Sequence, residues 1–413
     1  MSSFVEVAVI GAGPYGLSVA AHLNALGVDH RVFGKPMQLW REHMPPGMHL
    51  KSDGGSSDLA DAANELTLKK YCARAGLAHD DTRLPVPLDT FVAYGMAFQR
   101  RFAPHLEEKF LTSIERAANG FILHFDDHDV VMARRVVIAI GVSHFTFLPD
   151  FLDGLPQEFV THASRYGAFD ALRGKHVTVM GAGASALDTA GLLRESGVDV
   201  SVMTRRPSIE FHNPPGHRSW KNRLRAPNSG IGAGWQLRIF SNEPLTFHAL
   251  PESVRLHKAR TLLGPSAGWF MKDSIVGKVP LLTGLTPHRA EVRDGTLRID
   301  ATAADGSRRD IVTDHLIAGT GYKADLRRLG FLPDALRAQI KEVAHTPILS
   351  GNFESSVSGL YFVGPITLNS FGPTVRFVFG ARYTARRIAP ALVKSLIRRP
   401  AAAAVSAPGS VAG

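Results

Sequence analysis

The stretch VAVIGAGPYGLSVAAHL, residues 7–23, joins a β-branched apolar run to a glycine-rich turn and then to an apolar segment with helical spacing. In the pattern G-x-G-x-x-G, the first glycine makes a tight turn and the second lets a pyrophosphate approach the backbone. The third lets the helix pack closely on the strand. Gly11, Gly13 and Gly16 occupy these three positions. The stretch therefore predicts the strand, phosphate-binding turn and helix that begin a dinucleotide-binding fold.

The same pattern returns 170 residues later as VTVMGAGASALDTAGLL, residues 177–193. Gly181 and Gly183 take the first two positions, and Ala186 takes the third, where alanine is an accepted substitute. One such turn is a weak signal, because glycines follow many strands for structural reasons alone. Two turns, each between a predicted strand and a predicted helix, indicate that the chain binds two dinucleotides.

Further apolar strands that end in glycine are predicted in RRVVIAIG, DHLIAGTGY and GLYFVG, residues 134–141, 314–322 and 359–364. Near-continuous apolar strands suit a parallel sheet that is covered on both faces. The predicted class is α/β, with two Rossmann-like three-layer dinucleotide-binding domains, the second inserted into the first. The first domain is expected to resume at LIAGTGY.

The expected domain boundaries follow from this order. We expect a first domain made of residues 1–171 and 311–396, a second domain at 172–310, and a tail at 397–413 with the composition of a disordered end.

The residues about 20 positions after each turn decide which nucleotide is preferred. In the second fold they include Arg205 and Arg206, which can hold a 2′-phosphate through forked, charge-assisted hydrogen bonds. This predicts NADPH over NADH; the alternative is an ordinary exposed basic turn. In the first fold the position reads Gly34–Pro36 and offers no carboxylate to a ribose, so backbone groups, Lys35 or Gln38 would hold it.

Composition excludes several classes of protein. The 413 residues carry 47 Lys and Arg against 37 Asp and Glu, a net charge of +10, but the arginine pairs are scattered. A nucleic-acid surface would gather them on one face, so attraction of phosphorylated cofactors explains the charge better. The single cysteine, Cys72, excludes an intramolecular disulfide and a Cys-x-x-Cys pair. No apolar run reaches roughly 18 residues. We expect a cytoplasmic protein without a metal or a membrane partner.

Up to about residue 395, the chain resembles the NADPH-dependent single-component (class B) flavoprotein monooxygenases, near the flavin-containing monooxygenases and amino-acid N-hydroxylases. The matching segments are VIGAGPYGLS, LWREHMPPGMHLKS, VIAIGVSHFTFLP, THASRYGAFDALRGKHVTVMGAGASALD, IAGTGY and GLYFVGP. The resemblance implies FAD in the first fold and NADPH in the second. It also implies that a flavin C4a-hydroperoxide inserts one oxygen atom from O2 into a small electron-rich substrate. An amine, a sulfur compound, a ketone or a nitrogen heterocycle such as a purine would each fit.

Site residues follow from the turns and from the resemblance. The FAD candidates are Gly11, Gly13, Pro14, Tyr15, Gly16, Lys35, Trp40, Gly141 and Gly364. The NADPH candidates are Gly181, Gly183, Ala184, Ser185, Ala186, Arg205, Arg206 and His162.

Catalytic and substrate residues are predicted on segments expected near the flavin. Lys51 and Asp53 lie on a loop expected over its reactive face, where one could steady the peroxide or move its proton. The alternative is a solvated charge pair. Asn369, Ser370 and Phe371 follow the last sheet strand and are the substrate candidates, although Phe371 could equally belong to the core.

Two alternatives to a monooxygenase remain open. A reductase would pass electrons to a ferredoxin-type partner without oxygen insertion, and a non-catalytic NADP sensor would keep the fold without turnover. The basic segment at 212–235 is either a mobile lid over NADPH or a surface excursion. The expected partners are a small-molecule substrate and O2, with a homo-oligomer possible.

Overall fold

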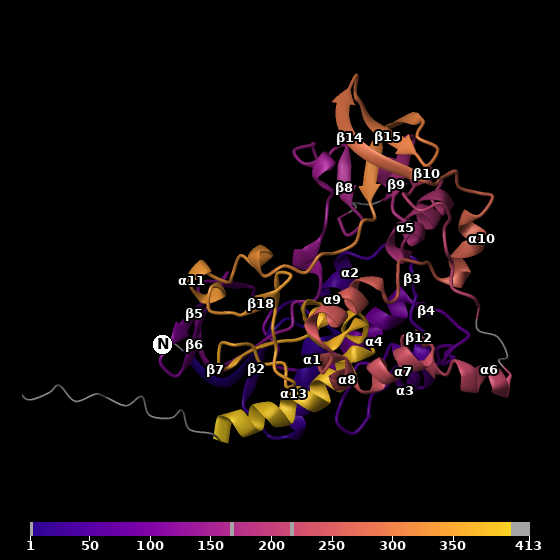
Figure 1. The fold of residues 1–413 in the computed structure, drawn as a ribbon. Coiled ribbons are helices and arrows are strands. Elements are labelled where there is room, and N and C mark those ends of the chain that lie inside the picture. The colour runs from indigo at the N-terminus through magenta and orange to yellow at the C-terminus, as the bar shows by residue number, and fades with distance from the viewer. Residues whose placement is uncertain (1–2, 166–168, 215–218, 398–413) are drawn as a thin grey trace, which may run out of the picture.

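A computed structural model describes residues 3–165, 169–214 and 219–397. The chain forms a large body and a smaller lobe, which lies above the body in Figure 1. Among these residues no helix is long and apolar enough to cross a membrane. The tail predicted at 397–413 lies almost wholly outside the described residues, which end at Ile397.

The body is built on a sheet of six strands. These strands are β1 (Ser3–Ile10), β2 (His30–Phe33), β5 (Leu111–Ala117), β6 (Gly120–Phe125), β7 (Val130–Ile138) and β20 (Leu360–Phe362). The first predicted strand, β1, lies between β2 and β7. β1 runs parallel to β2 and β7, and β20 joins the carboxyl half of β7 in parallel. β6 and β5 extend the sheet in antiparallel order. The predicted strands at 134–141 and 359–364 are thus confirmed as members of the first sheet.

Helices cover the first sheet because their apolar faces need a partner. The first glycine turn leads into α1 (Pro14–Ala25), whose residues from Tyr15 to Leu23 are buried. α1 packs against α4 (Leu88–Phe102) and against α13 (Gly380–Ile397), which runs along the lower edge of Figure 1. The first dinucleotide fold therefore combines both ends of the chain.

The upper lobe holds a second sheet of five parallel strands in the order β13-β10-β9-β17-β8. They are β8 (Val160–His162), β9 (His176–Met180), β10 (Asp199–Met203), β13 (Leu281–Leu282) and β17 (His315–Ala318). The second glycine turn leads from β9 into α5 (Ala184–Glu195). An antiparallel meander of β14 (Leu285–Arg293), β15 (Thr296–Ala303) and β16 (Arg308–Thr313) packs its apolar side against this sheet.

The expectation that the first domain resumes at LIAGTGY was wrong. This segment forms β17, which pairs with β9 and β8 in the second sheet. β8 also lies in the second sheet, although it precedes the predicted boundary at residue 172. An apolar strand buried on both faces has the same local pattern in either sheet. Its residues therefore predict a strand but not its neighbours.

Three helices that follow β10 in the sequence pack on the body and not on the upper lobe (Figure 1). They are α7 (Trp235–Asn242), α8 (Pro244–His248) and α9 (Glu252–Thr261). Phe240, Phe247 and Ala259 form a small core there, against Leu368 of the body. The chain leaves the upper lobe after Glu210 and returns at Ala267, whose N–H donates to the Glu210 carbonyl over 3.1 Å. We call residues 262–267 the return loop.

Candidate functional site

The first glycine turn leaves open space beside its second glycine only. A Cβ on Gly11, where φ is +113°, would lie 2.3 Å from the Ala139 carbonyl oxygen, and one on Gly16 would lie 1.8 Å from the Gly11 carbonyl oxygen. At Gly13, the N-cap of α1, a Cβ would meet nothing within 4 Å, and no side chain caps the helix. Free N–H groups at a helix N-terminus beside open space are what a pyrophosphate requires.

The second turn has a similar geometry, except that the position of a Cβ on its second glycine, Gly183, lies 3.5 Å from the Pro265 Cβ. A Cβ on Gly181, where φ is +147°, would lie 2.4 Å from the Gly319 carbonyl oxygen. Gly183 is the N-cap of α5, again without a side-chain cap, and Ala184 and Ser185 begin the helix. Ala186 lies directly against Gly319, a residue that the sequence analysis missed, although the GTG that ends a buried strand could have indicated it.

The two arginines after β10 are placed to bind a charged group. Arg205 is exposed, and within the described part of the chain it has no hydrogen-bond or ion-pair partner. Arg206 is half-buried and lies 3.7 Å from a Glu210 carboxylate oxygen. The pair fits a 2′-phosphate, so the residues present suit NADPH.

A carboxylate does lie near the end of β2, although farther along the chain than the usual offset of about 20 residues after the turn. Lys35 forms an ion pair with Glu42 of the short helix α2 (Gln38–Glu42). The Gln38 amide also donates to Glu42 over 3.0 Å. Hydrogen bonds from Lys35 and then from Gln38 hold the pKa of Glu42 below its ordinary value. The predicted ribose residues are therefore gathered around a carboxylate that a fixed offset could not identify.

Tyr15 has a structural role in the first fold. Its hydroxyl lies 2.9 Å from the Val375 carbonyl oxygen and 2.8 Å from that of Phe377, so it ties α1 to the carboxyl-terminal segment. The position of a Cβ on Gly364, where φ is +79°, lies 3.6 Å from the Tyr15 ring. Because the hydroxyl already bonds to backbone carbonyls of the protein, only the ring and backbone of Tyr15 remain available to a cofactor.

Two other FAD candidates differ in how open their surroundings are. Trp40 is half-buried and meets Phe91 edge-on, with ring centroids 4.7 Å apart. Gly141 follows β7 with φ of +66°, and a Cβ there would meet nothing within 4 Å. Direct contact of either residue with FAD stays a prediction.

The structure contradicts an NADPH contact through the ring of His162. This ring is 4 % exposed, and both of its nitrogens have partners in the protein. Nδ1 lies 2.9 Å from the Ser164 hydroxyl and Nε2 lies 3.0 Å from the Gly321 carbonyl oxygen. Burial lowers the pKa of His162, which favours the neutral ring. The residue joins the end of β8 to the loop after β17.

Phe371 is a core residue, and its prediction as a substrate contact was wrong. Its ring is fully buried between Phe353, at a centroid distance of 3.9 Å, and His248, at 5.1 Å. Ser370 is buried as well, whereas Asn369 is half-buried. An apolar residue after a strand has the same pattern in a pocket wall and in a core, so the sequence could not separate the two.

Lys51 and Asp53 do not form one site. The Lys51 ammonium donates to the backbone carbonyl of Ser266 over 2.7 Å and to its hydroxyl over 2.9 Å, which joins the body to the return loop. The side chain of Asp53 is exposed, and partial desolvation of its carboxylate together with the nearby charge of Asp80 raises its pKa. A role of Asp53 at the reactive face of the flavin stays a prediction.

A buried carboxylate of α5 acts on Lys51 from the upper lobe. Asp188 is 5 % exposed, and its Oδ1 has no hydrogen-bond partner among the described residues. Burial raises the pKa of Asp188 to about 7, and the charge of Lys51 opposes this shift. Burial lowers the pKa of Lys51 to about 8, and the charge of Asp188 opposes that shift in turn. The two groups are thus electrostatically coupled across the boundary between lobe and body.

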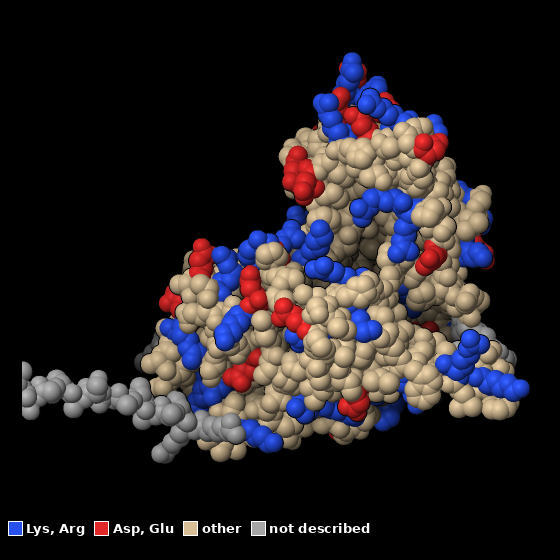
Figure 2. Space-filling model, viewed as in Figure 1, with Lys and Arg blue, Asp and Glu red and all other residues tan. Residues whose placement is uncertain are grey.

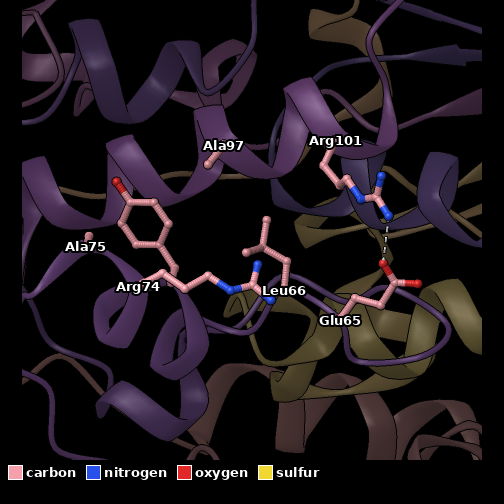
Figure 3. Close-up of a pocket in the computed structure, with 7 residues that line it drawn as sticks. Glu65, Leu66, Arg74, Ala75, Ala97 and Arg101 are labelled. Atoms are coloured by element: carbon pink, nitrogen blue, oxygen red, sulfur yellow. Dashed lines mark hydrogen bonds and ion pairs between the residues drawn. The ribbon is translucent and has the colours of Figure 1, made fainter.

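The space between the lobe and the body is hollowed, and Lys and Arg side chains gather at its rim (Figure 2). One cavity of about 210 Å³ lies at this boundary, between Gly47 and His49 of the body and Leu192 and Phe270 of the lobe. A larger cavity of about 540 Å³ lies between α3 (Leu68–Ala75) and α4 (Figure 3). Its lining includes the ion pair of Glu65 and Arg101 but no predicted cofactor residue, so size does not identify the active site.

The segment at 212–235 is described only in part, because 215–218 lie outside the described residues. Its α6 (Trp220–Arg225) is exposed, with Trp220 68 % accessible. A hairpin follows, in β11 (Asn228–Ser229) and β12 (Gly232–Ala233), and the position of a Cβ on Gly230 lies 2.2 Å from the Phe379 ring. The hairpin thus rests on the body, and a lid over NADPH stays a prediction.

Comparison with known proteins agrees with this geometry. Residues 5–226 match the pyridine nucleotide-disulphide oxidoreductase family. Indole-3-pyruvate monooxygenase YUCCA1 of Oryza sativa subsp. japonica is 29% identical over 86% of this chain and 85% of its own length. A ferredoxin–NADP reductase of Acidiphilium cryptum is 24% identical over 64% of this chain and 62% of its own. An ornithine N-hydroxylase of Kutzneria sp. 744 superposes with a TM-score of 0.76 at 16% identity, over 95% of this chain and 99% of that structure.

The chain therefore belongs to the pyridine nucleotide-disulphide oxidoreductase family, whose two-dinucleotide fold it has. Within that family it is similar to flavoprotein monooxygenases of class B, and its two glycine turns suit FAD and NADPH.

Proposed function

We propose that this enzyme passes a hydride from NADPH in the second fold to FAD in the first, and then inserts one atom of O2 into a small electron-rich molecule. The carrying observation is that both glycine turns lead into a helix N-terminus without a side-chain cap, with open space beside Gly13 and an ordinary contact with Pro265 beside Gly183. Lys51 also joins the body to a loop beside the second turn. These features support electron transfer across the boundary between lobe and body.

The residues of this chain bind and orient the cofactors. Bound flavin accepts the hydride and, once reduced, activates O2. The helix N-termini of α1 and α5 would hold the two pyrophosphates, and Arg205 and Arg206 would select the 2′-phosphate of NADPH. Closure of the lobe on the body would exclude water, which protects reactive intermediates from side reactions.

The substrate class proposed here is an amine, a sulfur compound, a ketone or a nitrogen heterocycle such as a purine. The names of two similar proteins suggest where a screen begins, since one is an indole-3-pyruvate monooxygenase and the other an ornithine N-hydroxylase.

The test is anaerobic reduction of the FAD-loaded protein by NADPH, followed by mixing with ¹⁸O₂ and a panel of these substrates. Stoichiometric flavin reduction and ¹⁸O in one product are expected. Flavin reduction that yields only hydrogen peroxide with every substrate would argue against oxygen insertion, and absence of flavin reduction would refute the cofactor assignment.

A reductase that donates electrons to a protein partner is the second candidate, favoured by the similarity to the ferredoxin–NADP reductase. The same protein would then reduce ferredoxin at the expense of NADPH. Oxidation of NADPH that depends on ferredoxin, with no ¹⁸O in any product, would support this candidate.

A further inference from the structure

The return loop touches both halves of the predicted NADPH site. The Pro265 Cβ lies 3.5 Å from the position of a Cβ on Gly183, the second glycine of the turn. An Arg206 guanidinium nitrogen lies 3.2 Å from the position of a Cβ on Gly264. The loop therefore lies beside both the pyrophosphate turn and one arginine of the 2′-phosphate site.

Two cations of the body hold this loop. Lys51 donates to the Ser266 carbonyl over 2.7 Å and to its hydroxyl over 2.9 Å. Arg376, at the end of η8 (Pro373–Arg376), donates to the carbonyls of Leu262 and Leu263 over 3.1 and 3.0 Å. Leu263 has φ of +55°, which a non-glycine residue adopts only where its surroundings impose it. The body thus contributes to the shape of the loop.

The charge of Lys51 has a counter-charge in the upper lobe. A partly buried ammonium is costly unless an anion lies near it. Asp188 is the anion that acts on Lys51 most strongly, and one of its carboxylate oxygens is buried without a partner among the described residues. Asp188 lies in the first half of α5, the helix that begins at Gly183.

We propose that Lys51 is a positioning residue for NADPH, which holds the return loop against the second glycine turn through Ser266, with Asp188 as its counter-charge. The inference rests on the proposed function, because it assumes that NADPH binds in the second fold. It differs from the catalytic role expected from the sequence, since Lys51 acts through Ser266 and not on the reacting atoms. A preformed loop lowers the cost of ordering it when NADPH binds.

The test measures the Kd of NADP⁺ for the FAD-loaded full chain by calorimetry, so that no turnover is needed. Lys51→Met is expected to raise this Kd about tenfold, as loss of a charge-assisted contact would. Ser266→Ala is expected to raise it about threefold, because the backbone carbonyl remains. The double variant is expected to match Lys51→Met, since two residues that act through one contact are not additive. Lys272→Met, at an exposed position of the upper lobe, is the matched control and leaves the Kd unchanged.

A pH profile separates positioning from mere structural support. The charges of Asp188 from α5 and of Arg376 from η8 act on the pKa of Lys51. The charge of Lys51 in turn acts on the pKa of His212, at the start of the segment at 212–235. Because the pKa of Lys51 is lowered to about 8, NADP⁺ affinity should fall as the pH rises through that value. Lys51→Arg keeps its charge and should restore affinity without this fall.

Each outcome bears on a different claim. Failure of the wild-type protein to bind NADP⁺ overturns the proposed function itself. Normal binding by the wild type with an unchanged Kd in Lys51→Met overturns the positioning role. If Lys51→Met loses flavin or thermal stability, Lys51→Arg decides instead, because an equal loss of affinity above pH 8 in this variant and in the wild type overturns the inference.

Discussion

A Cβ on Gly319 would lie 2.5 Å from the Cβ of Ala186, closer than two side chains can approach. In the first fold the two residue types are exchanged. Gly16 takes the third position of the turn, and a Cβ there would lie 3.5 Å from the Cβ of Ala139, the residue after β7. Each helix–strand contact thus pairs one glycine with one alanine, and the alanine in the second motif is tolerated because its neighbour is Gly319.

We predict that Gly319→Ala destabilises the upper lobe by about 1–3 kcal/mol, as is usual for overpacking. The reason is the steric clash with Ala186. Addition of Ala186→Gly should restore part of the loss, but not all, because the new methyl would still lie 2.9 Å from the Cα of residue 186 and 3.1 Å from the Met180 carbonyl oxygen. Thermal unfolding and NADP⁺ affinity of the two variants measure this. Equal stability of the single and double variants would contradict the proposed pairing.

Alanine substitutions at Gly13 and at Gly11 should have different effects on folding and on FAD binding. Gly13→Ala is expected to fold normally but to lose FAD, because the added methyl enters the open space assigned to the pyrophosphate. Gly11→Ala is expected to lose both stability and FAD, because its methyl meets the Ala139 carbonyl. The ratio of flavin to protein and the thermal midpoint distinguish the two. Full flavin content in Gly13→Ala would place the pyrophosphate elsewhere.

Replacement of both Arg205 and Arg206 with alanine should weaken NADPH binding about 10- to 100-fold and leave NADH almost unaffected. Charge-assisted hydrogen bonds to the 2′-phosphate, worth about 1.5–3 kcal/mol, would be lost only for NADPH. Rates of flavin reduction at varied NADPH and NADH concentrations measure the ratio. Arg238→Ala, an exposed arginine of α7, is the control. Equal losses for both nucleotides would refute the 2′-phosphate assignment.

The stability of the protein should depend on pH through Asp188. Its folded pKa, about 7, lies above the ordinary value of 3.8, so the folded state holds this proton more tightly. The free energy of unfolding therefore falls as the pH rises from about 4 to 7, by about 4 kcal/mol at most from this group. Asp188→Asn removes this pH dependence. The free energy of unfolding of the variant, relative to that of the wild type, should therefore increase as the pH rises from about 4 to 7. Denaturant unfolding at pH 5 and pH 8 tests this; a difference that does not change with pH would contradict it.

The residues alone are enough to predict both glycine turns, the strands and helices beside them, and the arginines after β10. These features depend on the backbone conformation and burial of residues that are neighbours in the sequence. The spacing of glycines and apolar residues reflects both properties. α1 and α5 begin at the predicted turns, and β7, β9 and β10 lie where apolar runs predict strands. Local patterns were therefore sufficient for two nucleotide folds.

The tertiary structure was needed to show which distant residues meet. It places β17 in the second sheet, brings Gly319 into contact with Ala186, and buries Phe371 in the core. It also joined Lys51 to Ser266, 215 residues away along the chain. Such contacts depend on how the upper lobe and the helices α7, α8 and α9 pack against the body. The local periodicity of apolar residues contains no information about that packing. The residue types at these positions are compatible with several neighbours, and the assembled fold selects one.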